Sequence, residues 1–302
     1  MIEYYKNTVS KIDLKKLKVF RVGSWVRVNN PTNEELEFLA SHHNLDMELL
    51  LEGLDDNELP RIDFDKENTY IYVKSGHQEE NKLVTILIVL GKDFILTLSK
   101  FTIDEFKPIF ENRVPIVTTQ RLKTLIRMLD LVDEGIQNDV VNAIKKVQQK
   151  KKTTKNLREK DMNELLDVED YLNNIVSMYY YTSLLYSKIT KHLRFYEEDK
   201  GLLEDLIVET EEGMNLCKNS LKTITNIRNN YSIILSNKLN RSIQILTIFT
   251  IMINIPAAIG GIYGMNIALP FQHSPYAFLY VMSLVVLLLG FFFVFARKKE
   301  LF

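Results

Sequence analysis

The sequence predicts an α/β domain followed by long helices and a two-span transmembrane helical domain. Residues 1–118 contain short runs in which apolar and polar residues alternate, as is typical of strands. Residues 119–240 carry apolar residues at helical spacing, and two long runs near the C-terminal end are uncharged. The average composition, 46% hydrophobic and 25% charged, hides this division. After Asn240 the only charged residues are Arg241, Arg297, Lys298, Lys299 and Glu300.

Within residues 1–118, a mixed sheet covered by short helices is expected. Residues 19–28, 61–74 and 83–99 predict strands, the last with a turn at 91–93. Thr32 and Glu35 form a capping box before a helix expected over 34–42, and residues 46–54 predict another short helix. We interpret the adjacent His42 and His43 as the end of the first helix rather than as metal ligands, and the lone Trp25 as a core residue.

Residues 119–240 predict long helices. The basic stretch 145–160 is poor in apolar residues and is expected to form the tip between two helices. It lacks interleaved aromatic residues, so we expect no nucleic-acid partner. A third helix is expected to begin near Asp199 and to run unbroken into the first apolar run. Sixty residues at about 1.5 Å each would reach roughly 90 Å.

The two uncharged runs are long enough to cross a lipid bilayer. They span 20 residues (243–262) and 21 residues (276–296), each roughly 30 Å as a helix. We expect transmembrane helices over 241–263 and 276–296, a connecting loop over 264–275 and a basic tail over 297–302. Lys238 and Arg241 precede the first uncharged run, a cluster of basic residues follows the second, and the loop has none. The positive-inside rule then predicts a cell-membrane protein with both ends in the cytoplasm and the loop outside.

The first span carries a polar stripe at heptad spacing. Its positions are Asn240, Ile243, Thr247, Thr250, Asn254, Ala257 and Gly261. Polar side chains in hydrocarbon must face a partner helix or water. Two helices enclose no lumen, so a water-filled pore would need a ring of several copies, a homo-oligomeric funnel. The stripe alone leaves two hypotheses open: a pore lining, or a dry seam of hydrogen bonds between helices.

Gly264, Met265 and Asn266 follow the stripe at the outer end of the span. We expect Gly264 to permit the tight turn that ends the helix and presents Asn266. Amide and carbonyl oxygens can accept hydrogen bonds from the water shell of Mg²⁺, an ion that gives up its waters reluctantly. Met265 is expected to pack against its neighbours, because a thioether is too soft a ligand for Mg²⁺.

Tyr263-Gly264-Met265-Asn266 in this position, with SNKLN at 236–240 and the basic tail, resembles the CorA-type divalent-cation channels. The resemblance implies a homopentamer with the first span lining the pore and Gly264, Met265 and Asn266 as the selectivity filter for hydrated Mg²⁺. It implies that Asn240 lines the pore and that a cytoplasmic basic ring is formed by Arg297, Lys298 and Lys299. It also implies a regulatory site for cytoplasmic divalent cations, whose acidic residue matches Asp205.

The chain departs from the family pattern at several positions. The outer loop reads IALPFQH after Asn266, without the carboxylate common in the family. Asn229 stands at an acidic position, Asn254 at a usually apolar gate position, and Pro256 is displaced by one residue. These differences leave the outer attraction of cations and the gating open to change.

We therefore expect a passive channel, driven by the membrane potential, for hydrated Mg²⁺ and also Co²⁺ or Ni²⁺, gated by cytoplasmic divalent cations. The sequence has no GxxxxGK[ST] phosphate loop and no constellation of catalytic residues, so we expect no enzyme. Two alternatives stay open: a transporter of zinc or another divalent cation on the same scaffold, and a non-conducting membrane-anchored oligomeric sensor.

Overall fold

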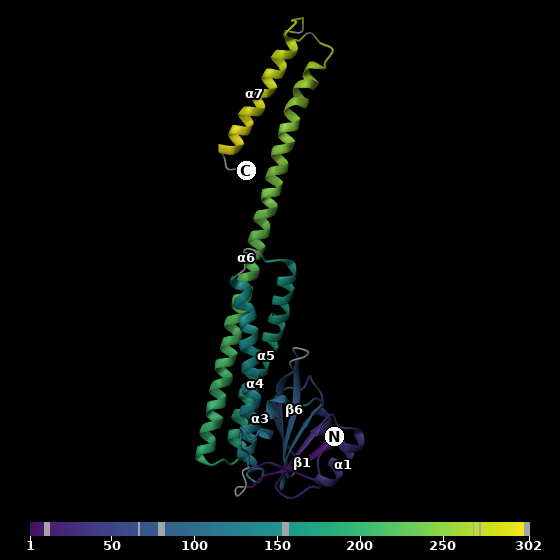
Figure 1. Ribbon diagram of the computed structural model, residues 1–302, viewed down its shortest axis with the longest axis vertical. Helices are drawn as coiled ribbons and strands as arrows, with labels where there is room; N and C mark the ends of the chain where they lie inside the picture. Colours follow the sequence, from purple (N-terminus) through teal and green to yellow (C-terminus); the bar gives the residue numbers. More distant parts are fainter. Residues whose placement is uncertain are drawn as a thin grey trace. The chain divides into compact units, whose positions relative to one another are not determined.

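The chain divides into two compact units, Met1–Asn226 and Ile227–Phe302 (Figure 1). The computed structural model describes residues 1–8, 13–65, 67–77, 82–152, 157–267, 269–271 and 273–298. An α/β sheet domain is followed by long helices and by two helices long and apolar enough to cross a membrane. This order confirms the fold class predicted from the sequence.

The first unit contains one mixed seven-stranded sheet. Its strand order is β2-β1-β3-β7-β6-β5-β4, and all neighbours are antiparallel except β3 with β7. The strands are β1 (Ile2–Lys6), β2 (Lys15–Leu17), β3 (Ser24–Asn29), β4 (Arg61–Asp65), β5 (Asn68–His77), β6 (Lys82–Leu90) and β7 (Phe94–Ser99). The sequence prediction missed β1 and β2. Strand β2 forms one edge of the sheet, where two lysines discourage pairing with another chain.

Short helices cover both faces of the sheet, and aromatic side chains hold them in place. On one face lie α1 (Asn33–His43) and α2 (Met47–Glu52), packed on buried tyrosines of β5. The hydroxyl of Tyr70 accepts from the Asp46 backbone N–H at 2.9 Å, and that of Tyr72 donates to the Leu49 carbonyl at 2.9 Å. On the other face Trp25 stacks on Phe110, which ends the pair η1 (Asp104–Phe106) and α3 (Lys107–Phe110). Trp25 is fully buried, as predicted.

Two local predictions in this region have opposite outcomes. The capping box is confirmed, since the Glu35 N–H donates to Thr32 Oγ1 and the Thr32 N–H donates to Glu35 Oε2. The strand predicted over residues 19–28 is too long, because β3 begins only at Ser24. Gly23 has a left-handed φ of 78°, and its N–H donates to the Asp93 carbonyl at 2.6 Å. This turn breaks the alternation before the strand starts.

Long helices make up the rest of the first unit. They are α4 (Arg121–Lys152), α5 (Glu159–His192) and the first part of α6 (Glu197–Tyr263). Both α4 and α5 extend into the basic stretch 145–160, of which residues 153–156 lie outside the described residues. Helix α6 runs without a break into the apolar run, as predicted, and Pro256 does not end it.

A buried polar contact joins α4 to α5. The hydroxyl of Tyr186 donates to Asp133 Oδ2 at 2.7 Å, and Asp133 is only 2% exposed. Burial raises the pKa of Asp133 to about 8, an effect that the Tyr186 hydrogen bond partly opposes and the nearby Glu209 and Asp130 charges increase. Asp133 is therefore a neutral hydrogen-bonded acid at physiological pH, and burying this form costs less free energy than burying a carboxylate.

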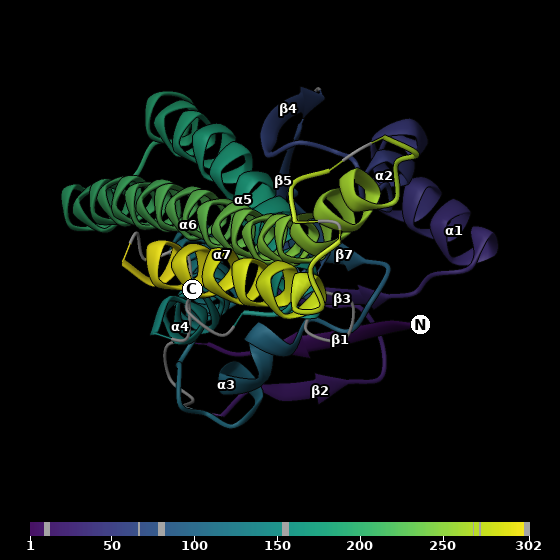
Figure 2. The same cartoon turned by 90° about the horizontal axis from the view of Figure 1, so that it is seen from above.

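The second unit contains the rest of α6 and α7 (Ala277–Lys298), which lie side by side (Figures 1 and 2). Most of their side chains are exposed in the single chain. Large apolar side chains on so much of the surface indicate that lipid or other protein covers these helices.

Asp133→Asn should make the first unit more stable at alkaline pH. The folded-state pKa of Asp133 lies above its unfolded value, so the folded chain holds the proton more tightly and stability falls as pH rises from about 4 to 8. The slope should approach about 1.4 kcal/mol per pH unit, and the amide variant should lose it. Urea unfolding of the full chain in detergent, followed by the fluorescence of Trp25, measures this. Asp130→Asn, a half-exposed neighbour on α4, is the control, and an unchanged slope in Asp133→Asn contradicts the assignment.

Candidate functional site

One face of α6 in the second unit is less exposed than the others, and α7 is the helix that lies beside α6 in this unit (Figures 1 and 2). Ile248 is buried, and Met252, Ile255 and Ile259 are partly buried. Their spacing of four, three and four residues marks a single helix face. On α7 the buried positions are Val285 and Ala296. The sequence could not predict this seam, because nearly every residue around it is apolar and periodicity then carries no signal.

The predicted stripe lies on a different face of α6. All seven of its members are exposed in the single chain: Asn240, Ile243, Thr247, Thr250, Asn254, Ala257 and Gly261. At about 100° per residue, their mean direction lies about 140° from that of the face covered by α7. The stripe therefore points away from α7, so α7 cannot supply the polar partners that its side chains need.

The polar groups of the stripe are only partly satisfied within the chain. Thr247 Oγ1 donates to the Ile243 carbonyl at 2.8 Å, and Thr250 Oγ1 donates to the Leu246 carbonyl at 2.9 Å. A hydroxyl that donates to its own helix keeps its oxygen lone pairs for a donor outside. The side-chain amides of Asn240 and Asn254 make no hydrogen bond to any described residue. The stripe thus presents a row of hydrogen-bond acceptors whose donors must come from water, an ion's water shell or another chain.

The Gly264-Met265-Asn266 segment forms an exposed turn directly after α6 ends at Tyr263. The Gly264 N–H donates to the Gly260 carbonyl at 2.9 Å, and the Met265 N–H donates to the Ile262 carbonyl at 3.2 Å. Gly264 does not use the left-handed conformation common at such ends, since Gly23 is the sole described glycine with positive φ. It instead continues the helical hydrogen bonding for one more residue. Met265 is 52% exposed, so the packing predicted for it is not supplied by the single chain.

The glycines near the end of α6 also lack neighbours in the chain. A Cβ added at Gly260 or Gly261 would meet no heavy atom within 4 Å. Small residues on a membrane helix usually permit a close approach of another helix. Because α7 makes no such approach here, a close neighbour of these glycines would have to come from another copy.

The predicted regulatory and basic residues lie at separate places. Asp205 is exposed on α6 in the first unit, whereas Arg297 and Lys298 are exposed at the end of α7 in the second. Lys299 lies outside the described residues. Among the described residues no group of three or more His, Cys, Asp or Glu side chains could hold a metal ion. A divalent cation at Asp205 would therefore need ligands from a second chain.

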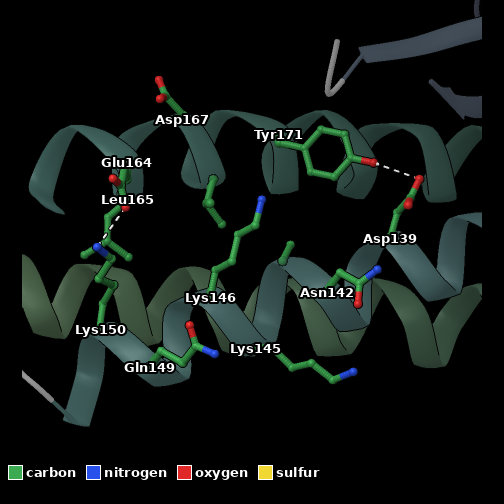
Figure 3. Close-up of a pocket in the computed structure, with 12 residues that line it drawn as sticks. Asp139, Asn142, Lys145, Lys146, Gln149, Lys150, Glu164, Leu165, Asp167 and Tyr171 are labelled. Atoms are coloured by element: carbon green, nitrogen blue, oxygen red, sulfur yellow. Dashed lines mark hydrogen bonds and ion pairs between the residues drawn. The ribbon is translucent and has the colours of Figure 1, made fainter. Parts of the chain in front are cut away.

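The first unit also contains a cavity of about 880 Å³ between α4 and α5 (Figure 3). Lys146 of α4 extends between the two helices, whereas Lys145 of α4 and Asp167 of α5 point away from the space between them. The Lys150–Glu164 ion pair (2.7 Å) lies at one end and the hydrogen bond from Tyr171 to Asp139 (3.4 Å) at the other. Burial raises the pKa of Asp139. This mixture of charges does not form a cation site, and Asp205 is not part of it.

Comparisons with known proteins cover nearly the whole chain. The family described as CorA-like Mg²⁺ transporter protein matches residues 21–299. The cobalt/magnesium transport protein CorA of Methanocaldococcus jannaschii is 26% identical over 295 residues, which cover 91% of this chain and 90% of that protein.

Solved structures agree in fold from end to end. The complete structure of the CorA magnesium transporter from Methanocaldococcus jannaschii has a TM-score of 0.87 at 20% identity, covering 100% of this chain and 99% of that one. The full-length CmaX protein has a TM-score of 0.76 at 13% identity, covering 99% and 97%. Since the family match includes five of the seven strands, the long helices and both apolar helices, the chain belongs to the family of CorA-like Mg²⁺ transporter proteins.

Proposed function

We propose that this protein is a passive, membrane-potential-driven channel for hydrated Mg²⁺, and also for Co²⁺ or Ni²⁺, built as a homopentamer in the cell membrane. The stripe of α6 lines the pore, the Gly264-Met265-Asn266 turn forms its outer selectivity site, and both chain ends are cytoplasmic. The observation that carries the proposal is the exposed, partly unsatisfied polar face of α6, which points away from α7.

The free-energy cost of polar groups without hydrogen-bond partners favours a water-filled axis between copies over exposure of this face to lipid. An unpaired amide in hydrocarbon costs roughly 2–7 kcal/mol, and the stripe contains two amides without a partner among the described residues. Its two Thr hydroxyls donate to their own helix and leave only their acceptor capacity unused. Facing the stripes of several copies toward one axis removes this cost, because water or a hydrated ion can hydrogen-bond to them. A dry seam between copies would also remove it, and flux through purified protein distinguishes the two.

The donor set suits a hydrated dication. Asn oxygens and Thr oxygens accept hydrogen bonds from bound water without stripping it from the ion. They bear no charge, so each site holds the ion weakly, which conduction through several sites in series requires. The membrane potential supplies about 2.3 kcal/mol per charge per 100 mV, hence roughly 4.6 for a dication, and uptake needs no coupled energy source.

We further propose that cytoplasmic divalent cations gate the channel through Asp205. Asp205 is exposed on the same uninterrupted helix that carries the stripe. A divalent cation shared between Asp205 and acidic groups of the adjacent subunit would cancel their repulsion and hold the ring closed. Loss of the cation would restore the repulsion and loosen the ring.

Asn266→Ala should reduce Mg²⁺ uptake at least ten-fold and abolish the preference for Mg²⁺ over Zn²⁺, because the amide that orients the hydration shell is removed. Ion-competition flux with the full chain in liposomes measures both quantities, and it also separates a magnesium from a zinc transporter. Ile262→Leu is the matched control, since Ile262 lies near the end of α6 outside the stripe and the turn, and an apolar swap of equal volume there should preserve flux. Selective uptake at wild-type rate by Asn266→Ala would exclude this residue from the filter.

Asn254→Leu should reduce flux at least ten-fold while leaving the assembly intact, because an apolar ring in a narrow wet pore excludes water. Flux and oligomer mass are measured on the same preparation. Phe249→Leu, on the same helix but away from the stripe, is expected to conduct normally. If Asn254→Leu instead dissociates the oligomer, and wild-type protein conducts nothing, the stripe is a dry seam.

Asp205→Ala should weaken inhibition by internal Mg²⁺ several-fold, because one carboxylate of each bridging site is lost. Flux is recorded as a function of internal Mg²⁺, with the exposed neighbour Glu204→Ala as the control. Inhibition of the Asp205 variant at the wild-type concentration removes Asp205 from the gate.

A further inference from the structure

The segment that joins α6 to α7 carries a single group that can change its charge near neutral pH. Residues 264–275 contain no Asp, Glu, Lys or Arg, and their one histidine is His273. Histidine is the side-chain type that changes charge between pH 5 and 8. His273 is therefore the one residue of this segment whose side-chain type can gain a charge in that range.

His273 lies in a hydrogen-bonded turn at the start of α7. Phe271 has a φ of 64°, and its carbonyl accepts from the Ser274 N–H at 3.0 Å. Ser274 then accepts at its carbonyl from the Ala277 N–H and at Oγ from the Tyr276 N–H. Its neighbours thus tie His273 to the first turn of α7, while His273 itself is exposed and makes no hydrogen bond to a described residue.

No fixed charge competes with His273 at this end of the second unit. The titratable groups that flank the segment are Tyr263 at the end of α6, Tyr276 directly before α7 and Tyr280 in the first turn of α7. Phenols are neutral over the pH range in which histidines titrate. The nearest charged residues along the chain, Arg241 and Arg297, lie toward the opposite ends of the two spans.

The attraction for a cation at this end is correspondingly weak. The last carbonyls of α6 give its C-terminal end a partial negative charge of about half an electron. Two of these carbonyls already accept the N–H groups of Gly264 and Met265. One full positive charge per chain on the adjoining turn would exceed this partial charge and reverse the sign of the local potential.

We propose that His273 is an external proton sensor that sets the rate of cation entry: neutral His273 leaves the outer mouth attractive to dications, and protonated His273 makes it repulsive. This inference rests on the proposed channel with its connecting segment outside. It assigns to one histidine the electrostatic control that a fixed carboxylate would otherwise supply.

The expected effect follows from Coulomb's law. If five protonated histidines lie about 15 Å from a dication in water, they slow its entry by more than about ten-fold at 0.01 M salt, where the screening length is about 30 Å. At 0.15 M salt, with a screening length of about 8 Å, the same charges slow entry by only about two-fold. A strong salt dependence distinguishes this mechanism from a pH effect on the fold.

The test is uptake of Mg²⁺ or Co²⁺ by cells that express the full chain, with internal pH and membrane potential clamped. External pH is stepped between 7.5 and 5.5 in low and in physiological salt. Wild-type uptake should fall about ten-fold at pH 5.5 in low salt. His273→Gln should be insensitive to this step, and His273→Lys should be slow at both pH values and recover as salt is added. His42→Gln, on α1 of the first unit, should behave like wild type.

Two results would overturn the proposal, and they differ from each other. If wild-type protein takes up cations but His273→Gln keeps the full pH dependence, the sensor is elsewhere while the channel stands. If wild-type protein reaches the membrane and takes up no cation at either pH, the channel itself fails and the role of His273 fails with it.

Discussion

The organisation of the second unit depends on where unsatisfied hydrogen-bonding groups can go in an apolar surrounding. Helix α6 presents two Asn amides and two Thr hydroxyls on a face that α7 does not cover. The least exposed face of α6 is apolar, with Ile248 buried and Met252, Ile255 and Ile259 partly buried. The apolar contact of this helix within the chain therefore lies on one side. The opposite side can be completed only by water, by an ion with its water shell, or by another copy of the chain.

The glycines at the end of α6 also require a neighbour from outside the chain, for a steric rather than a polar reason. No atom of the chain approaches Gly260 or Gly261 within 4 Å of an added Cβ. A helix gives up side-chain packing at such positions only when something else needs the space. A narrow axis surrounded by several copies meets the steric and the polar requirement together, which neither lipid nor α7 can do.

Much of this organisation could be predicted from sequence because hydrophobic periodicity and charge are strong signals. The heptad of Asn and Thr stands out against an apolar background, and the capping box at Thr32 and Glu35 fixes a helix start by local hydrogen bonds. Contacts set by tertiary packing carry no such signal. The Asp133–Tyr186 bond joins residues 53 positions apart, and the face of α6 that meets α7 consists of the same residue types as its surroundings. Gly23, which shortens the predicted strand, is identified only by its backbone angle.

The absence of carboxylates from the connecting segment has a consequence for selectivity. A carboxylate ring concentrates every cation, so it raises the rate of entry and leaves discrimination to later sites. Neutral amides attract much less but respond to the geometry of the water shell, in which Mg²⁺ differs from larger or softer ions. In the proposed channel the acceptors between Asn240 and Asn266 are all neutral, so discrimination there would rest on hydrogen bonds to bound water rather than on charge. In the same proposed channel, long-range electrostatics near the connecting turn would be left to His273, the one side chain of the segment that is not permanently neutral.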